Sequence, residues 1–167
     1  MKIIKINKLG IKKIYPKTNF VDSRGKYIEI FNKKFFKKKL HLDFVEGDIS
    51  YSKKNVFRGI HGDYKTWKLV SCVHGKIEQF IVDCRKNSKT FGLYKKFILS
   101  SDNYYQILIP PGFGNAYLTL SNLSIYHYKQ TRYYSGSKNQ FTYSWKDPKI
   151  NLKLSVKKPI LSKRDSL

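Results

Sequence analysis

Acidic residues and arginines are scarce in this chain, and the imbalance limits what its partners can be. The 167 residues include 11 Asp and Glu against 34 Lys and Arg, which gives a formal net charge of +23. Such a surplus is compatible with nucleic acid, an anionic surface or a phosphorylated substrate. Only five of the basic residues are arginines, while lysine, isoleucine, asparagine and tyrosine are abundant. This bias is typical of an AT-rich coding sequence, so we expect no nucleic-acid partner.

Cysteine is almost absent as well. Cys72 and Cys84 flank a turn signal at Gly75. If the flanking strands pair as a hairpin, Cys72 lies opposite a residue near Glu78, and the two thiols do not face each other. Two cysteines without a disulfide framework or metal-type spacing are typical of a reducing compartment, so we expect a cytoplasmic protein.

Long apolar runs, repeats and linkers are also missing. The start, Met1 to Ile6, is interrupted by lysines and lacks a cleavage site, which argues against a secretory signal. No apolar run is long enough to span a bilayer, so we expect no membrane partner. Hydrophobic residues make up 41% of the chain, enough for a substantial core. We expect residues 1–167 to fold as a single domain.

Short strand-like runs are what the chain does contain. They are Lys26–Phe31, Trp67–Val73, Lys76–Asp83, Tyr94–Leu99, Tyr105–Ile109, Ala116–Leu120, Ile125–Gln130 and Phe141–Trp145. The one plausible helix is short, around Lys33 to Leu40. Many short strands with little helix favour an all-β sandwich or barrel, and we expect a jelly roll that binds a small ligand at its mouth.

Three groups that could carry chemistry lie close together in the sequence: Arg58, His61 and Lys68. Histidine moves protons near neutral pH, and the two cations suit phosphates or a developing oxyanion. Strict alternation along a strand would put Arg58 and His61 on opposite faces. Both reach one site only if Gly59 permits a bulge. Lys68 is part of an apolar run, which favours an inward position.

Two further features concern a tyrosine cluster and a loop. Tyr128 is a strand tyrosine that can be simple core, but an inward phenol is also able to donate a proton to a carbanion. The loop from Pro110 to Asn115 resembles the turn before the second metal motif of cupins, with Asn115 where that motif supplies a histidine. We therefore expect no metal. His41, His74 and His127 show no ligand spacing.

A series of motifs runs in order from about Phe20 to Asp165. The series comprises Phe20-Val21-Asp22-Ser23-Arg24-Gly25, Phe57-Arg58-Gly59-Ile60-His61, Lys68-Leu69-Val70, Gly75, Val82-Asp83-Cys84-Arg85, Ser88-Lys89-Thr90-Phe91-Gly92, Ile109-Pro110-Pro111-Gly112-Phe113, Tyr128-Lys129, Tyr133-Tyr134, Trp145-Lys146-Asp147 and the segment 159–165. Together these motifs resemble the sugar-nucleotide 3,5-epimerases typified by dTDP-4-dehydrorhamnose 3,5-epimerase. Ordered agreement over nearly the whole chain is far more specific than any one motif.

The resemblance implies a cupin-type jelly roll, a homodimer, a nucleotide-diphosphate sugar as substrate, no metal and no redox cofactor. It also implies that His61 is the general base, that Asp165 is the carboxylate paired with it, and that Tyr128 is the general acid. The implied substrate-binding residues are Arg58 and Lys68 near the sugar and phosphates, Phe20, Arg24 and Glu29 near the nucleotide, partly across a dimer interface, and Asn115 and Tyr134.

Departures from the family pattern bear on the substrate. Asn115 stands where many members have a histidine, and Glu46 and Asp48 replace the usual Gln and Asn. Arg-Gly-Ile-His-Gly-Asp together with Gly-Asn resembles a subgroup that acts on GDP-4-keto-6-deoxyheptose in capsular polysaccharide synthesis and includes enzymes that invert carbon 3 alone. We expect such an epimerase, with a dTDP-4-keto-6-deoxyglucose 3,5-epimerase or 3,4-ketoisomerase as alternatives. A basic polyanion-binding protein is the non-enzymatic alternative.

Overall fold

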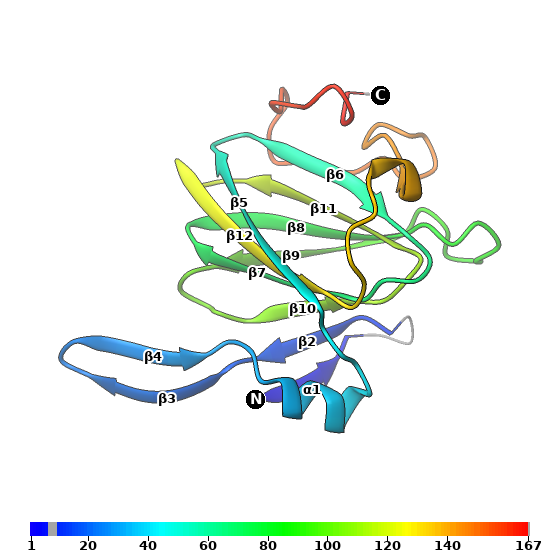
Figure 1. The fold of residues 1–167 in the computed structure, drawn as a ribbon. Helices are drawn as coiled ribbons and strands as arrows, with labels where there is room; N and C mark the ends of the chain where they lie inside the picture. The colour runs from blue at the N-terminus through cyan, green and yellow to red at the C-terminus, as the bar shows by residue number, and fades with distance from the viewer. Residues whose placement is uncertain (7–9, 167) are drawn as a thin grey trace.

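Two antiparallel sheets face each other and form most of the protein (Figure 1). The computed structural model describes residues 1–6 and 10–166. Its elements are β1 (Lys2–Lys5), β2 (Lys12–Tyr15), β3 (Lys17–Asp22), β4 (Gly25–Glu29), α1 (Lys33–Leu40), β5 (Glu46–Lys53), β6 (Phe57–Gly62), β7 (Lys68–His74), β8 (Lys76–Asp83), β9 (Tyr94–Ser100), β10 (Gln106–Ile109), β11 (Phe113–Thr119), β12 (Leu123–Gln130), the 3-10 helix η1 (Ser137–Asn139) and β13 (Phe141–Thr142). The predicted all-β jelly roll with little helix is confirmed.

The strand order explains how distant segments meet. One sheet has the order β1-β2-β10-β7-β12-β5, and the other has the order β13-β6-β11-β8-β9. Strands β3 and β4 form a separate hairpin that projects from the sandwich (Figure 1). Consecutive strands therefore tend to alternate between sheets, as in a jelly roll, and a cavity between the sheets receives residues from widely separated parts of the chain.

The expected hairpin around Gly75 is wrong. Strands β7 and β8 follow each other in sequence but belong to different sheets, so the turn at Gly75 leads from one sheet to the other. Cys72 lies opposite Tyr126 of β12 rather than opposite a residue near Glu78. Both cysteines are nonetheless free and buried, as the sequence indicated.

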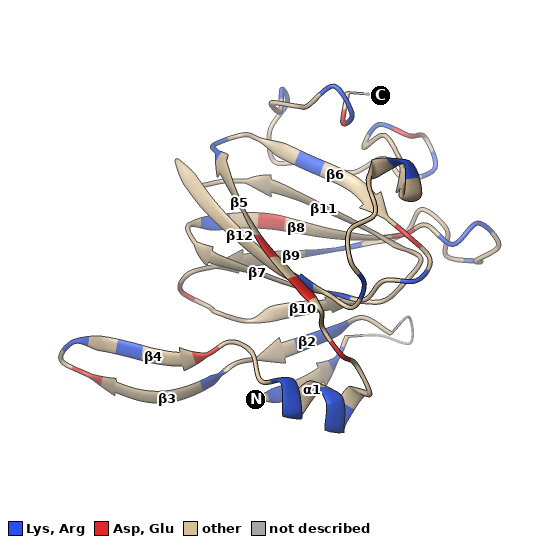
Figure 2. Ribbon diagram, in the orientation of Figure 1, with Lys and Arg blue, Asp and Glu red and all other residues tan. Residues whose placement is uncertain are grey.

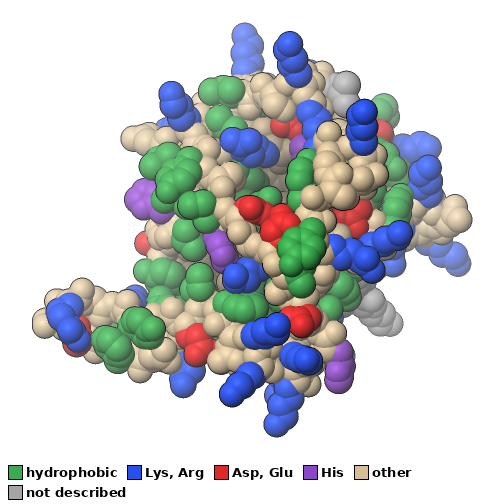
Figure 3. Space-filling model, viewed as in Figure 1, with side chains coloured by type: hydrophobic (Ala, Val, Ile, Leu, Met, Phe, Trp, Pro, Cys, Tyr) green, Lys and Arg blue, Asp and Glu red, His purple; other side chains and the backbone are tan. Residues whose placement is uncertain are grey.

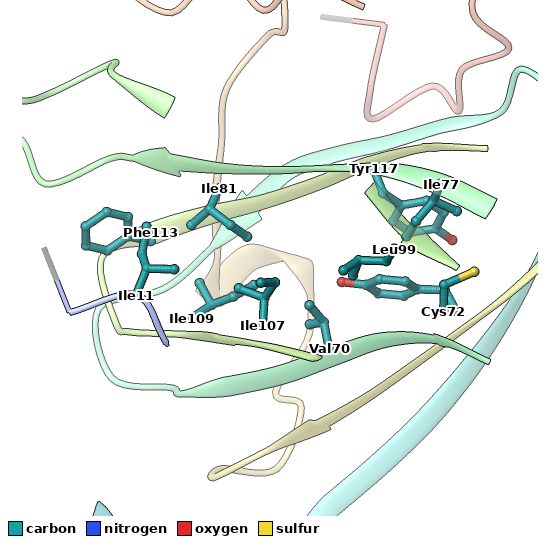
Figure 4. Packing of buried hydrophobic residues seen from close by; sticks show 11 residues of the cluster. Ile11, Val70, Cys72, Ile77, Ile81, Leu99, Ile107, Ile109, Phe113 and Tyr117 are labelled. Atoms are coloured by element: carbon teal, nitrogen blue, oxygen red, sulfur yellow. The ribbon is translucent and has the colours of Figure 1, made fainter. Parts of the chain in front are cut away.

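The space between the sheets is filled at one end by apolar side chains (Figure 4). This cluster includes Val70 and Ile107 from one sheet and Ile77 and Ile81 from the other, each fully buried. Alternate residues of a strand point to opposite faces, so these residues all sit on the inward faces of their strands. Burying a Val, Leu or Ile side chain contributes about 1.5–3 kcal/mol, which makes this end the rigid frame of the molecule.

Helix α1 and the C-terminal segment cover the outer faces. Asn32 caps α1 by accepting a 3.0 Å hydrogen bond from the backbone N–H of Phe35, and Phe36 is the helix residue that is fully buried. On the other sheet, Ile150 and Leu152 pack against the outward face of β6, β8 and β11. Both sheets are thus shielded on two sides.

The last part of the chain is fixed to the start of β6. Ile160 accepts a 3.0 Å hydrogen bond from the N–H of Phe57 and donates a 2.8 Å bond to the carbonyl of Asn55. These two bonds place the turn that contains Asp165 over β6. The contact matters for the site, because it joins the C-terminal turn to a strand more than half the chain away.

Basic side chains are spread widely over the protein. Lys and Arg occur on the projecting hairpin, on α1 and on the loops (Figure 2), and they are scattered over the face seen in Figure 3. On that face they do not form a single continuous basic patch. In the part of the chain that the structure describes, no helix has the length and apolar character needed to cross a membrane.

Candidate functional site

A cavity of about 310 Å³ lies between the two sheets, beside the apolar core. Its walls come from both sheets and from the C-terminal turn. The lining residues are Ser50, Arg58, Gly59, His61, Lys68, Asn115, Tyr117, Tyr126, Tyr128, Gln130, Tyr134, Gln140 and Arg164. Polar and aromatic groups dominate this list, whereas the neighbouring interior is apolar. The cavity is therefore a built site, not a gap in packing.

A larger hollow of about 810 Å³ adjoins the cavity and shares Gln130, Tyr134 and Gln140 with it. Basic residues such as Lys65, Arg132 and Lys138 contribute to its wall, but none of the three expected catalytic residues does. Size alone would favour the larger hollow. The chemistry favours the smaller one, because His61 and Tyr128, which can transfer protons, line it together with three cations, and neither lines the larger hollow.

Gly59 brings Arg58 and His61 to the same cavity. In the pairing of β6 with β11, His61 lies opposite Asn115 while Arg58 lies opposite Tyr117, so the register shifts between them. This is the bulge that the sequence required. Gly59 has φ of 123°, and a Cβ there would lie 2.4 Å from the Cβ of Ala116. Only glycine fits this close approach.

His61 is backed by a buried carboxylate. Its Nε2 lies 2.8 Å from Oδ1 of Asp165, whose side chain is 4% exposed. The ring N–H does not point along this line, so the contact is an ion-pair approach and not an aligned hydrogen bond. Asp165 also accepts from Ser162 Oγ at 2.7 Å and from the N–H of Gly59 at 3.3 Å.

These contacts keep the Asp165 carboxylate charged. Burial by itself would raise its pKa, but the close approach of the His61 ring and the hydrogen bond from Ser162 outweigh burial, and the pKa lies below its usual value. A fixed negative charge behind an imidazole orients the ring and stabilises its protonated form. The pair has the arrangement expected of a general base and its orienting group.

Tyr128 reaches the cavity from the opposite sheet. It lies on β12, whereas His61 lies on β6, so the two side chains enter the same space from two sides. Burial, reinforced by the negative charge of Asp48, raises the pKa of Tyr128 to about 12. The phenol therefore stays protonated near neutral pH and is able to act as an acid.

Three cations line the cavity: Arg58, Lys68 and Arg164. Among the described residues no Asp or Glu lines it with them. Burial lowers the pKa of Lys68, an effect that Asp63 opposes and Arg164 reinforces. A positive, partly desolvated pocket suits a diphosphate or a developing oxyanion, because charge interactions strengthen away from water.

Hydrogen bonds hold two of the cations in place. Arg58 Nε donates to Ser52 Oγ at 3.1 Å, and Ser52 Oγ lies 3.0 Å from the hydroxyl of Tyr117. Arg164 donates from Nε to Thr142 Oγ1 at 3.0 Å and from a terminal nitrogen to Gln140 Oε1 at 3.2 Å. Such anchoring reduces the entropy lost when a ligand is bound.

The structure brings together most of the expected site residues, but not all of them. Asn115 and Tyr134 line the cavity, and the N–H of Tyr134 donates a 2.8 Å hydrogen bond to Glu46. Phe20, Arg24 and Glu29 do not line it, since they belong to the projecting β3–β4 hairpin. Within the single chain, these three do not join the other site residues.

Several cavity residues were missed by sequence reasoning. Arg164 is the clearest case: it was part of a matching motif, yet received no role. Its neighbour Asp165 faces His61, so one turn supplies both a cation and a carboxylate. Ser50, Tyr117, Tyr126, Gln130 and Gln140 were also missed. Their inward positions follow from strand pairing that no local pattern reveals.

No group of three or more His, Cys, Asp or Glu side chains within the described ranges is arranged to hold a metal ion. His127, on the outward side of β12, lies 3.4 Å from Ser71 Oγ. It is not among the cavity residues.

The chain is similar to known proteins over nearly its whole length. The family model for dTDP-4-dehydrorhamnose 3,5-epimerase matches residues 8–167. The curated dTDP-4-dehydrorhamnose 3,5-epimerase of Shigella flexneri is 36% identical over 170 residues, covering 99% of this chain and 93% of the relative.

Solved structures show the same fold. A dTDP-6-deoxy-D-glucose-3,5-epimerase of Legionella pneumophila, in complex with dTDP-4-keto-L-rhamnose, superposes with a TM-score of 0.89 and 33% identity, covering 99% of this chain and 89% of that one. A dTDP-4-dehydrorhamnose 3,5-epimerase of Bacillus anthracis, with TDP and pyrophosphate bound, superposes with a TM-score of 0.90 and 34% identity. The match covers 98% of this chain and 95% of that one. The chain therefore belongs to the dTDP-4-dehydrorhamnose 3,5-epimerase family of sugar-nucleotide isomerases.

Proposed function

We propose that this protein inverts carbons 3 and 5 of dTDP-4-keto-6-deoxyglucose, with His61 as base and Tyr128 as acid. The observation that carries the proposal is the entry of these two groups into one cationic cavity from opposite sheets. Inversion at carbon requires removal of a proton on one face and its return on the other. A base and an acid on two sides of a cavity meet that requirement.

The chemistry follows from the ketone at carbon 4. It acidifies the hydrogens on carbons 3 and 5, because the carbanion left behind delocalises into an enolate. His61 takes the proton, and Asp165 at 2.8 Å stabilises the imidazolium that forms. Lys68 and Arg58 hold the negative oxygen or the phosphates, and Tyr128 returns a proton to the opposite face. Water in the cavity then restores both groups.

The nucleotide proposed here differs from the one that the sequence motifs indicated. The relatives described above are dTDP-sugar enzymes, and none of them supports the GDP-heptose expectation drawn from Arg-Gly-Ile-His-Gly-Asp together with Gly-Asn. This is why dTDP-4-keto-6-deoxyglucose takes precedence here. A direct competition between the two nucleotide sugars decides between them: the dTDP substrate is expected to have the higher kcat/KM.

The projecting hairpin supports a second part of the proposal, a homodimer. Phe20 and Tyr27 stack at 5.4 Å on the hairpin, and both are at least half exposed. Arg24 lies 5.9 Å from the Phe20 ring. An exposed aromatic pair with a neighbouring cation suits a nucleotide base and its phosphates. In a dimer the hairpin can reach the cavity of the second copy, so the proposal predicts a dimer by light scattering.

One experiment tests the reaction. The protein is incubated with dTDP-4-keto-6-deoxyglucose in deuterated water, and NMR follows deuterium at carbons 3 and 5 and their configuration. Wild type is expected to exchange and invert both carbons. Deuterium with a moved keto group would instead show a ketoisomerase, and binding without exchange would show a polyanion-binding protein.

Two variants assign the roles. His61→Asn is expected to abolish exchange, and Tyr128→Phe to lose inversion more than exchange. His127→Asn and Tyr51→Phe are matched controls, because neither side chain lines the cavity. Wild-type exchange by a folded His61→Asn protein would overturn the assignment of the base.

A further inference from the structure

Asn115 presents one end of its side-chain amide to the cavity, and the other end is already occupied. Its Oδ1 accepts a hydrogen bond from Gln79 Nε2 at 2.7 Å and another from the hydroxyl of Tyr126 at 3.0 Å. In the strand pairing, Asn115 lies directly opposite His61. The orientation of this amide therefore decides whether a donor or an acceptor stands beside the base.

Gln79 fixes that orientation. Its Nε2 also lies 2.8 Å from the carbonyl of Ala116 and 3.1 Å from the carbonyl of Phe80. Backbone carbonyls only accept hydrogen bonds, so the nitrogen end of Gln79 must face them. Gln79 is 0% exposed, so bulk water offers no alternative partner. The group that meets Asn115 is consequently a donor, and it requires the oxygen of Asn115.

Tyr126 cannot set the orientation alone. A phenol hydroxyl is able both to donate and to accept, so it would tolerate either end of the Asn115 amide. Gln79 removes this ambiguity. Among the described residues, Asn115 Nδ2 has no hydrogen-bond partner, and it is not one of the sealed polar atoms of the interior. Its two N–H groups are the free end of the amide at the cavity wall.

We infer that Asn115 donates a hydrogen bond to the oxygen on carbon 4 of the sugar, and that Gln79 is the positioning residue which holds it in that orientation. The inference rests on the proposed function and adds two roles to it. Carbons 3 and 5 both flank carbon 4, and enolate charge develops on the oxygen of carbon 4. A donor on the strand position paired with His61 can reach that oxygen while His61 removes a proton from either carbon. A neutral amide also keeps its donor character at every pH at which the enzyme is folded.

An interaction with the enolate oxygen is stronger in the transition state than in the ground state. Its loss lowers kcat and leaves KM nearly unchanged, whereas loss of a bond to a hydroxyl that does not react raises KM. Asn115→Leu removes the donor, and kcat is expected to fall on the order of 10²-fold. Asn115→Asp replaces the donor with an acceptor, and its kcat is expected to fall at least as far as that of Asn115→Leu.

Gln79→Met tests the positioning role. Methionine fills a similar volume but leaves Asn115 free to turn, so kcat is expected to fall about 10-fold, with the larger loss reserved for Asn115 itself. Gln106→Met is the matched control: Gln106 is also a buried strand glutamine, its amide has no partner in the described residues, and it does not line the cavity. Its kcat is expected to stay within twofold of wild type.

The outcomes separate the two claims. If wild type exchanges no hydrogen of dTDP-4-keto-6-deoxyglucose, the proposed function fails. If wild type is active but Asn115→Leu keeps its kcat, or changes KM alone, the inference fails while the function stands. If Gln79→Met folds, a kcat loss in Gln106→Met equal to that in Gln79→Met would overturn the positioning role. If Gln79→Met does not fold, the two Asn115 variants still decide the donor role.

Discussion

Two buried carboxylates, Asp83 and Asp165, have different surroundings and invite different uses. Asp83 is 1% exposed and accepts hydrogen bonds from Arg85, Ser88 and Thr90, all within seven residues of it. Asp165 is 4% exposed and contacts Gly59, which lies 106 positions earlier, as well as His61. The first network is local in sequence. The second combines a local bond from Ser162 with contacts to Gly59 and His61 that exist only in the folded chain.

The two networks also differ in completeness. Both oxygens of Asp83 are filled by aligned donors, with Arg85 bound to each of them. The pKa of Asp83 lies far below its usual range, since these bonds outweigh the opposing effect of burial. Around Asp165 the His61 contact is short but poorly aligned. We expect Asp83, whose hydrogen bonds are complete, to stabilise the fold. We expect Asp165, whose contact with His61 is not an aligned hydrogen bond, to act in the chemistry of the site.

The largest expected effect is on catalysis, from Asp165→Asn. The amide keeps the shape of the side chain but removes the charge that stabilises the imidazolium, so kcat is expected to fall on the order of 10³-fold. Thermal unfolding followed by circular dichroism is expected to stay within a few degrees of wild type. If Asp165→Asn instead unfolds at a much lower temperature than wild type, Asp165 stabilises the fold as Asp83 does, and the expected difference between the two carboxylates is wrong.

Asp83→Asn is expected to show the reverse. It replaces a carboxylate bound by Arg85, Ser88 and Thr90, and hydrogen bonds to charged groups contribute about 1.5–3 kcal/mol. Unfolding in urea is expected to show a loss of about 2 kcal/mol with kcat within threefold of wild type. Asp43→Asn is the control, since Asp43 belongs to an exposed ion pair with Lys33. Its loss is expected to be under about 1 kcal/mol.

The stabilising role of Asp83 can also be tested by its dependence on pH. The folded-state pKa of Asp83 is depressed, so its network stabilises the protein above the ordinary carboxyl pKa of about 4 and loses that contribution as the pH falls below it. The difference in unfolding free energy between wild type and Asp83→Asn is therefore expected to be full at pH 7 and to shrink below about pH 4. Urea titrations at several pH values measure it, and a difference that grows in acid would contradict the assignment.

The smallest expected effect comes from Ser162→Ala. Ser162 donates a 2.7 Å hydrogen bond to Asp165 from within the same turn. Its removal is expected to cost about 1 kcal/mol of unfolding free energy and less than tenfold in kcat, because His61 and Gly59 still hold the carboxylate. A loss in kcat equal to that of Asp165→Asn would mean that the turn, and not the charge, is what matters.

Sequence patterns predicted the fold where an apolar run or an amphipathic pattern marks the element. The runs Lys76–Asp83 and Lys33–Leu40 were predicted with the bounds that β8 and α1 have. Strand β5 was missed, and so were β1 to β3. On the inward face of β5, Ser50 lines the cavity and Ser52 contacts the Tyr117 hydroxyl, while Ile49 and Tyr51 point outward and are exposed. A polar inward face inverts the pattern on which strand prediction relies.

The site was predictable to a similar extent. Local reasoning found Arg58, His61 and the need for a bulge at Gly59, because these lie within one strand. The roles expected of Tyr128, which lines the same cavity, and of Asp165, which contacts His61 from behind it, came from family resemblance. The roles of Gln79 and Arg164 were invisible, since each depends on side-chain contacts across elements that only the folded chain defines.

The crowding at Gly59 also bears on how this enzyme can change its substrate. The backbone there touches Ala116 and Asn115 so closely that no side chain can be accommodated. Evolution toward another sugar must therefore leave this point of β6 unchanged and alter other residues that line the cavity. A library intended to alter substrate preference has most to gain from varying Gln130 and Tyr134, which line both the cavity and the larger hollow, while keeping position 59 and the donor Asn115 constant.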